Sequence, residues 1–248
     1  MSTPEPRGLP AGYARPAPGT DAPLISPAYR STAARAPSRP LVALTPGLNE
    51  LTGPLFGMDR VRPGDADLSR GPSGDALGQR IVVAGRVLDA DGRPIPDALI
   101  EIWQANASGR YHHERDNWPA PLDPNFSGGG RTVTDEEGHY RFLTIKPGAY
   151  PWANHVNAWR PAHIHVSLFG RSFSQRLVTQ MYFPDDPLFF QDPILGAIPD
   201  PAARRRLVSA YDHALTEAQW ALGFRWDIVL RGPLAVPFEP LSEQDHHG

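Results

Sequence analysis

The sequence contains no cysteine among its 248 residues. This absence excludes disulfide bonds, thiolate metal ligands and catalytic thiols. It does not indicate whether the protein resides in an oxidising or a reducing compartment. An excess of charge is also missing, because 24 basic residues stand against 27 acidic ones. No strong field would therefore draw the protein to nucleic acid or to an anionic membrane, and we expect neither as a partner.

Long apolar segments are absent as well. No run reaches the length needed to span a membrane. Residues 1–19 lack the basic region and the apolar region that together form a signal peptide. The sequence therefore predicts a soluble, cytoplasmic protein.

Turn-forming residues, in contrast, are abundant, with 29 prolines and 23 glycines. They divide the chain into short segments, which favours an all-β domain with long Pro/Gly-rich loops. Strand-like patterns occur at residues 81–90, 98–104, 131–134, 139–145, 162–169, 177–183 and 224–231. Strands at this spacing indicate a β-sandwich.

The chain divides into three parts by composition. Residues 1–80 are rich in Pro, Gly, Ser and Arg and show little periodicity, which predicts an extended N-terminal arm that packs on the core or on a partner subunit. A disordered tail is the alternative for residues 1–20. We expect the β-sandwich domain at residues 81–240 and a loose C-terminal tail at 241–248.

One short helix is expected near residues 200–215. Asp200 can cap its N-terminus, and Pro201 suits its first turn. A one-sided apolar stripe follows at Leu207, Val208, Tyr211 and Leu215.

A candidate metal site lies between Tyr111 and His165. His163 and His165 are two residues apart in a predicted strand, so their side chains point to the same face. Tyr150 precedes them across a loop that is long enough to bring its phenol back over the strand. Singly, each of these residues is more often structural than metal-binding, since histidines and half-buried tyrosines are common in packed cores.

The donor types restrict the metal that such a set could hold. Zinc would favour more histidine or cysteine, while calcium and magnesium would require carboxylates. A phenolate is a hard, strongly donating anion that stabilises a trivalent ion, as tyrosinate does for iron in haem catalase. Two phenols and two imidazoles therefore predict non-haem Fe(III), unlike the two-histidine, one-carboxylate site of ferrous oxygenases.

Several segments of the chain resemble the intradiol ring-cleaving dioxygenases, over about residues 29–238. They are VAGRV (83–87), EIWQANA (101–107), GRY (109–111), IKPGAYPW (145–152), WRPAHIH (159–165) and FRWDIVLRG (224–232). This resemblance implies a β-sandwich enzyme in which four residues ligate ferric iron: Tyr111, Tyr150, His163 and His165.

The same resemblance implies roles for further residues. Tyr150 would be the axial ligand that leaves when a catechol binds and then takes one catechol proton. Arg160 would stabilise negative charge on the bound substrate, with a surface salt bridge as the alternative. Three residues would contact or surround the substrate: Tyr29, Trp152 and Gln180.

The implied reaction is the cleavage of protocatechuate by O2. The implied partner is a homologous α subunit that forms an αβ protomer and a higher oligomer with this chain. A catechol or hydroxyquinol 1,2-dioxygenase is an alternative, although those relatives carry an N-terminal helical segment whose periodicity residues 1–80 lack. Residues 85–98 also resemble a non-catalytic, transthyretin-like binding module, which would have no need of paired tyrosines beside His-x-His.

Overall fold

A computed structural model describes residues 14–39, 61–156, 159–170 and 176–238. The predicted C-terminal tail at 241–248 and two parts of the predicted arm, 1–13 and 40–60, lie outside the described residues. Among the helices that the structure describes, none is long and apolar enough to cross a membrane.

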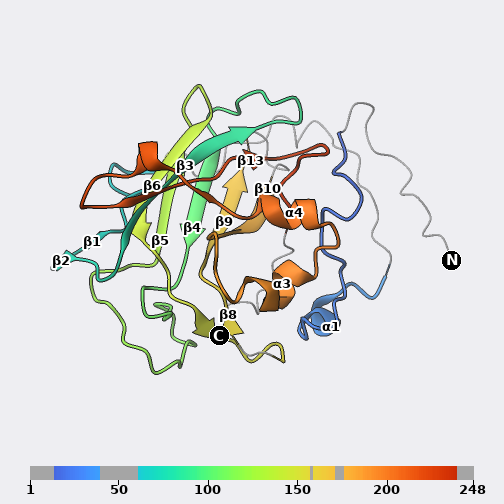
Figure 1. The fold of residues 1–248 in the computed structure, drawn as a ribbon, viewed down its shortest axis with the longest axis horizontal. Helices are drawn as coiled ribbons and strands as arrows, with labels where there is room; N and C mark the ends of the chain where they lie inside the picture. Colours follow the sequence, from blue (N-terminus) through green and yellow to red (C-terminus); the bar gives the residue numbers. More distant parts are fainter. Residues whose placement is uncertain (1–13, 40–60, 157–158, 171–175, 239–248) are drawn as a thin grey trace.

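Two larger β-sheets and two short two-stranded ones build the described part of the chain (Figure 1). The longer strands are β3 (Arg80–Leu88), β4 (Leu99–Trp103), β5 (Gly129–Val133), β6 (His139–Ile145), β9 (His163–Phe169), β10 (Arg176–Tyr182) and β12 (Leu222–Arg225). The short strands are β1 (Arg70–Gly71), β2 (Gly74–Asp75), β7 (Tyr150–Pro151), β8 (Trp159–Arg160), β11 (Ala210–Tyr211) and β13 (Ile228–Val229).

The first sheet has the strand order β10-β9-β4-β5, and all its pairs are antiparallel. The second has the order β11-β12-β3-β13, with β6 on the other edge of β3; β12 and β13 run parallel to β3. One apolar core joins side chains from both sheets, so the predicted all-β sandwich is confirmed.

Alternation along the strands explains which side chains enter that core. In β4, Ile100 and Ile102 are buried between the sheets, while Glu101 is half-buried on the other side. In β9, Ile164 and Val166 occupy the same core. His163 and His165 therefore project from the outer face of the first sheet, because successive side chains point to opposite sides of a strand.

Strand register brings further polar side chains to this outer face. Trp103 of β4 and Gln180 of β10 lie directly opposite His165 on its two sides. Tyr182 of β10 lies opposite His163. The sheet thus assembles one end of its outer face from three neighbouring strands.

Several short helices connect the strands. They are α1 (Thr32–Arg35), η2 (Phe189–Gln191), α3 (Pro193–Gly196), α4 (Pro201–Arg206) and η3 (His213–Leu215). The prediction of a single helix was therefore incomplete. Its start is confirmed, since the Asp200 carboxylate accepts hydrogen bonds from Ala202 N at 2.9 Å and Ala203 N at 3.2 Å.

The predicted extension of this helix to residue 215 is wrong. After Arg206 the backbone turns to other partners: Ser209 N donates to Tyr182 O at 2.9 Å, and Tyr211 pairs with Phe224 in the second sheet. The apolar stripe read from the sequence is therefore divided among a helix end, a strand and a 3-10 turn. Hydrogen bonds to strands replace those that would continue the helix.

The predicted strand at 224–231 is interrupted between β12 and β13. Trp226 N donates to Ala84 O at 2.9 Å, and the Trp226 indole N–H donates to Arg206 O at 2.8 Å. The backbone approaches β3 very closely here, since a Cβ on Gly85 would lie 1.9 Å from Trp226 O. Gly85 is thus required in β3 at the point where its neighbour changes from β12 to β13.

The described part of the arm contacts its own chain. Asp200 N donates to Gly19 O at 3.0 Å, and Ser31 N donates to Asn154 Oδ1 at 2.8 Å. These bonds connect the arm with α4 and with the loop between β7 and β8.

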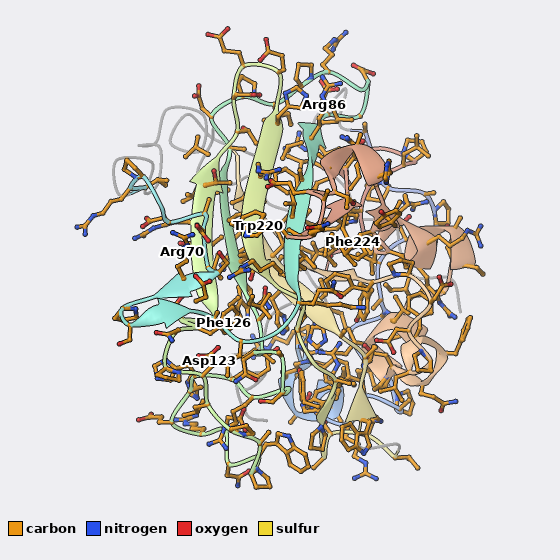
Figure 2. The ribbon with its side chains drawn as sticks, turned by 60° about the vertical axis from the view of Figure 1, so that its left-hand side comes forward. Arg70, Arg86, Asp123, Phe126, Trp220 and Phe224 are labelled. Atoms are coloured by element: carbon orange, nitrogen blue, oxygen red, sulfur yellow. The ribbon has the colours of Figure 1, made fainter. Side chains whose placement is uncertain are left out.

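A second part of the predicted arm forms the β1–β2 hairpin, which the sequence did not predict. Leu77 N, just after β2, donates to Asp123 Oδ2 at 2.6 Å. Figure 2 shows Asp123 and Phe126 below this hairpin. The hairpin is therefore attached to the loop that leads into β5.

Candidate metal centre

Three of the predicted donor atoms converge on one point. His163 Nε2 lies 3.2 Å from His165 Nε2 and 3.3 Å from Tyr150 Oη. The fourth predicted residue, Tyr111, stacks edge-on against Tyr150 with ring centroids 5.3 Å apart, and its ring lies 6.3 Å from that of His165. The structure thus brings together all four residues that the sequence singled out.

The histidine rings are oriented by neighbours other than each other. The Nδ1 of His163 bonds the Pro161 carbonyl at 2.8 Å, which places the proton on Nδ1 and leaves Nε2 with a lone pair. The His165 ring stacks flat on Trp103, with centroids 4.8 Å apart and 4° between the planes. Both Nε2 atoms are therefore held toward the same space.

The geometry of this space fits a metal ion. Around a first-row ion with N and O ligands at about 2.1 Å, neighbouring donor atoms lie about 3 Å apart. The separations of 3.2 and 3.3 Å agree with that spacing. In addition, the Tyr111 hydroxyl is buried and makes no hydrogen bond within the described part of the chain. A buried phenol without a partner is costly in a packed protein, and a metal ligand bond would satisfy it.

A tight loop after β4 positions Tyr111. Asn106 Oδ1 accepts hydrogen bonds from Ser108 N at 3.0 Å and from Arg110 N at 2.9 Å. Asp116 then accepts the backbone N–H of Tyr111 at 2.7 Å. Asp116 is buried, and its role was not predicted from the sequence.

Gly109 lets this loop press against the segment that carries Tyr150. Its φ is +78°, and a Cβ at this position would lie 2.3 Å from Ala149 O. Tyr150 itself begins β7, where it pairs directly with Arg160 of β8. One glycine therefore sets the distance between the two tyrosine-bearing segments.

Burial keeps this site neutral without a cation. It raises the pKa of Tyr150 above its ordinary value, and it raises that of Tyr111 further, with the Tyr150 phenol adding to the effect. Burial, and then the Arg160 charge, hold the pKa of His163 well below its ordinary value. Unprotonated imidazoles can act as ligands directly, whereas ionising the phenols requires a bound positive charge.

Arg160 is fully buried beside these donors, which argues against the surface salt bridge considered as its alternative role. Its Nη1 donates to His163 Nε2 at 3.0 Å, and its Nη2 donates to Asp192 Oδ2 at 2.7 Å. Burial alone would lower the pKa of Arg160, but the negative charge of Asp192 reverses the effect and keeps it well above its ordinary value. Asp192 was not predicted as part of this site, although Asp192-Pro193 is typical of a helix N-cap.

The three predicted substrate-contacting residues lie in different places. Trp152 lines a cavity of about 280 Å³ beside the donors, together with Trp103, Gln104, Tyr111, His112, His113, Asp116, Ser127, Gly128, Gly129, Tyr150 and His165. Tyr29 packs behind Trp152, with ring centroids 5.2 Å apart. Gln180 accepts from Arg160 Nη2 at 2.6 Å. Tyr29 and Gln180 do not line this cavity, and contact of all three with substrate stays a prediction.

A second group of possible ligands, Asp135, Glu137 and His139, lies on the surface. Asp135 accepts the backbone N–H groups of Glu137 at 3.1 Å and of His139 at 2.7 Å. These bonds form the β-turn between β5 and β6. The group is explained by turn formation.

Two family models match this sequence. The model described as dioxygenase matches residues 51–232, and the model described as protocatechuate 3,4-dioxygenase beta subunit N terminal matches residues 13–46. The first match covers most of the sandwich and the second covers much of the arm.

Among curated proteins, the chain is similar to the protocatechuate 3,4-dioxygenase beta chain of Burkholderia cepacia. The two are 55% identical over 217 residues, which cover 87% of this chain and 92% of that protein. The chain is also 31% identical to the protocatechuate 3,4-dioxygenase alpha chain of Pseudomonas putida, over 160 residues that cover 64% of this chain and 74% of that protein.

Among solved structures, 3-chlorocatechol 1,2-dioxygenase from Rhodococcus opacus 1CP shares the fold. It matches with a TM-score of 0.53 at 22% sequence identity, covering 68% of this chain and 66% of that chain. This likeness concerns the architecture alone and agrees with the two packed sheets.

Proposed function

The chain belongs to the dioxygenase family of intradiol ring-cleaving enzymes, and on this basis we propose that it cleaves protocatechuate with O2 to 3-carboxy-cis,cis-muconate. The family implies non-haem iron, and we propose that this chain is the iron-bearing beta subunit. The observation that carries the proposal is that Tyr150 Oη and His165 Nε2 both lie within 3.3 Å of His163 Nε2. The family match and this donor set support the same chemistry.

The residues that would hold ferric iron are Tyr111, Tyr150, His163 and His165. Bound there, the ion would accept both catechol oxygens as ligands and supply electron withdrawal from the ring, which would make a ring carbon reactive toward O2. Two phenolates suit a trivalent ion because they neutralise most of its charge in a buried site.

Side chains of the protein would accept a proton from the substrate and stabilise its negative charge. Tyr150 Oη would accept one catechol proton once its phenolate is released, and it would hold that proton inside the cavity. Arg160 Nη1 would donate a hydrogen bond to the negative charge that develops on the bound substrate. The indole of Trp152 would form a wall that excludes water.

The visible spectrum of purified, iron-loaded protein tests this assignment. Charge transfer from tyrosinate to ferric iron should give a burgundy solution. Replacing Tyr150 by Phe should shift the band and slow turnover while iron stays bound. Tyr140 offers a matched control, since its buried hydroxyl donates to Trp226 O in the core, and Tyr140→Phe should leave the band unchanged. A colourless protein that contains full iron would refute the ligand set.

Substrate assays separate the remaining alternatives. Protocatechuate should be cleaved much faster than catechol or hydroxyquinol. Faster turnover of the unsubstituted ring would favour a catechol 1,2-dioxygenase. Complete inactivity toward every catechol, with or without a partner chain, would favour a transthyretin-like binding module.

We propose a homologous alpha subunit as the partner, in an αβ protomer that assembles into a higher oligomer. The similarity of this chain to both a beta chain and an alpha chain supports such a pair. Two aromatic side chains are also exposed on neighbouring elements near the site: Trp159 of β8 at 40% and Phe190 of η2 at 90%.

Co-expression with an alpha chain tests this partner. Phe190→Asp should weaken co-purification. Leu77→Asp should not, because Leu77 is also exposed, at 72%, but follows β2, on the opposite side of the molecule from α3 in Figure 1. Equal recovery of both variants would remove Phe190 from the interface. The division into arm, sandwich and tail at residues 80 and 240, and the cytoplasmic location, stay predictions.

A further inference from the structure

A buried polar network lies behind the donor atoms. Arg160 Nη2 shares its two N–H groups among three acceptors: Asp192 Oδ2 at 2.7 Å, Gln180 Oε1 at 2.6 Å and Tyr182 Oη at 3.0 Å. All four side chains are buried. Nη2 is therefore engaged by these three polar groups, while Nη1 is directed at His163 Nε2.

The ion pair in this network compensates a charge that the protein interior would otherwise not tolerate. Arg160 is 2% exposed and Asp192 is 1% exposed. Asp192 is the one acidic residue that pairs with Arg160 within the described part of the chain. Removing one member of a buried pair leaves an uncompensated charge, which then moves toward water or another partner.

Asp192 is itself fixed by the backbone. Its Oδ1 accepts the N–H of Ile194 at 2.9 Å as the N-cap of α3, and Pro193 fixes the backbone that follows. The two carboxylate oxygens thus have different tasks: Oδ1 is tied to the helix, and Oδ2 faces the guanidinium. This division allows a rigid backbone position to set the position of Arg160.

Trp152 and Tyr182 also hold the Arg160 guanidinium in place. The Arg160 guanidinium lies 5.2 Å from the centroid of the Trp152 ring. The Tyr182 hydroxyl lies 2.9 Å from Asp192 Oδ2 and 3.0 Å from Gln180 Oε1. Arg160 is therefore held from one face by an indole and along one edge by three polar groups.

We propose that Asp192 is the positioning residue of this site. It holds the Arg160 guanidinium so that Nη1 points at the proposed metal ligand His163. This proposal rests on the proposed function and deepens it. Asp192 acts through Arg160 and contacts neither the donor atoms nor the substrate cavity. It works because groups that stabilise developing charge must be held in place before the reaction begins.

Asp192→Asn is the first test, because it keeps the side-chain volume and an oxygen that can cap α3 while it removes the negative charge. Asp200→Asn is the matched control: Asp200 is also an N-cap followed by proline, at α4, and it has no contact with Arg160. We expect turnover per bound iron to fall about 100-fold in Asp192→Asn, with KM changed much less, and to stay unchanged in Asp200→Asn.

A second readout is independent of activity. In the metal-free protein, the ¹⁵N resonance of His163 Nε2 reports the hydrogen bond from Arg160 Nη1. It should shift in Asp192→Asn and stay in place in Asp200→Asn. An unshifted resonance together with normal turnover per iron in Asp192→Asn would overturn the proposal.

Two further outcomes remain decisive. If Asp192→Asn does not fold, Tyr182→Phe removes a neighbour of the same carboxylate oxygen, and it should shift the same resonance and lower turnover less strongly. No change in either readout of that variant would refute the network. If the wild-type protein cleaves no catechol but Asp192→Asn still shifts the resonance, then the proposed function fails while the positioning role stands.

Discussion

Gly109 provides the sharpest test of how the loop geometry builds the metal centre. Replacing it by Ala adds a single methyl group at φ +78°, in the left-handed region that residues with a Cβ seldom adopt. This backbone conformation costs about 1–2 kcal/mol for a residue other than glycine. In addition, the new Cβ would lie 2.3 Å from Ala149 O and 3.2 Å from the Cβ of Tyr150.

The contact with Ala149 O decides the functional result. Ordinary van der Waals contact begins at 3.4 Å, so the gap of 2.3 Å must open by 1.1 Å, the difference between the two values. The atom in the way belongs to backbone, which cannot rotate aside. The segment that carries Tyr111 must therefore move away from the segment that carries Tyr150. Misplacement by about 1 Å costs on the order of 100-fold in rate.

Gly92→Ala separates this displacement from the cost of the backbone conformation. Gly92 has a φ of +75°, and a Cβ there would meet nothing within 4 Å. Both variants should lose about 1–2 kcal/mol in urea unfolding from the left-handed backbone. Only Gly109→Ala should also lose turnover and shift the visible band of the iron-loaded protein. Equal turnover of the two variants would refute the reasoning.

Two further predictions concern single hydrogen-bonded carboxylates. Asp116→Ala removes the acceptor of the Tyr111 backbone N–H. Because a hydrogen bond to a charged group contributes about 1.5–3 kcal/mol, the iron affinity measured by chelator competition should fall about tenfold or more. Unchanged affinity would show that Asn106 alone fixes the loop. The Arg225 side chain, which donates to Asp212, lowers the pKa of Asp212 below its ordinary value of 3.8. Its stabilising contribution is therefore complete above that value and is lost as the pH falls through the lowered pKa, so the stability advantage of the wild type over Asp212→Asn should disappear in urea unfolding at low pH. A difference that persists undiminished at low pH would assign the effect to the η3 cap instead of the ion pair.

Much of the fold could be predicted because its physics is local. Ile100 and Ile102 flank the polar Glu101, and this period of two is enough to indicate a strand and its buried face. The start of α4 was equally predictable, since Asp200 and Pro201 act within one turn. Its end was not predictable, because Ser209 N donates to the carbonyl of Tyr182, which lies far upstream in the sequence. No periodic pattern around Ser209 indicates that partner.

The candidate site shows the same division. His163 and His165 were found through strand alternation, and the two tyrosines through the chemistry of donors and a family resemblance. Asp192 escaped because its sequence context is fully explained by helix capping, while its second oxygen pairs with an arginine 32 residues away. Such a double role becomes visible only when the chain is folded.

Strand β9 has a consequence for how this protein can change. Its inward residues, among them Ile164 and Val166, pack the core, and its outward residues His163 and His165 face the proposed metal. Substitutions on one side should alter the free energy of unfolding, and substitutions on the other should alter metal affinity. Selection can therefore adjust chemistry and stability separately along the same seven residues, and new metal preferences are reachable without repacking the interior.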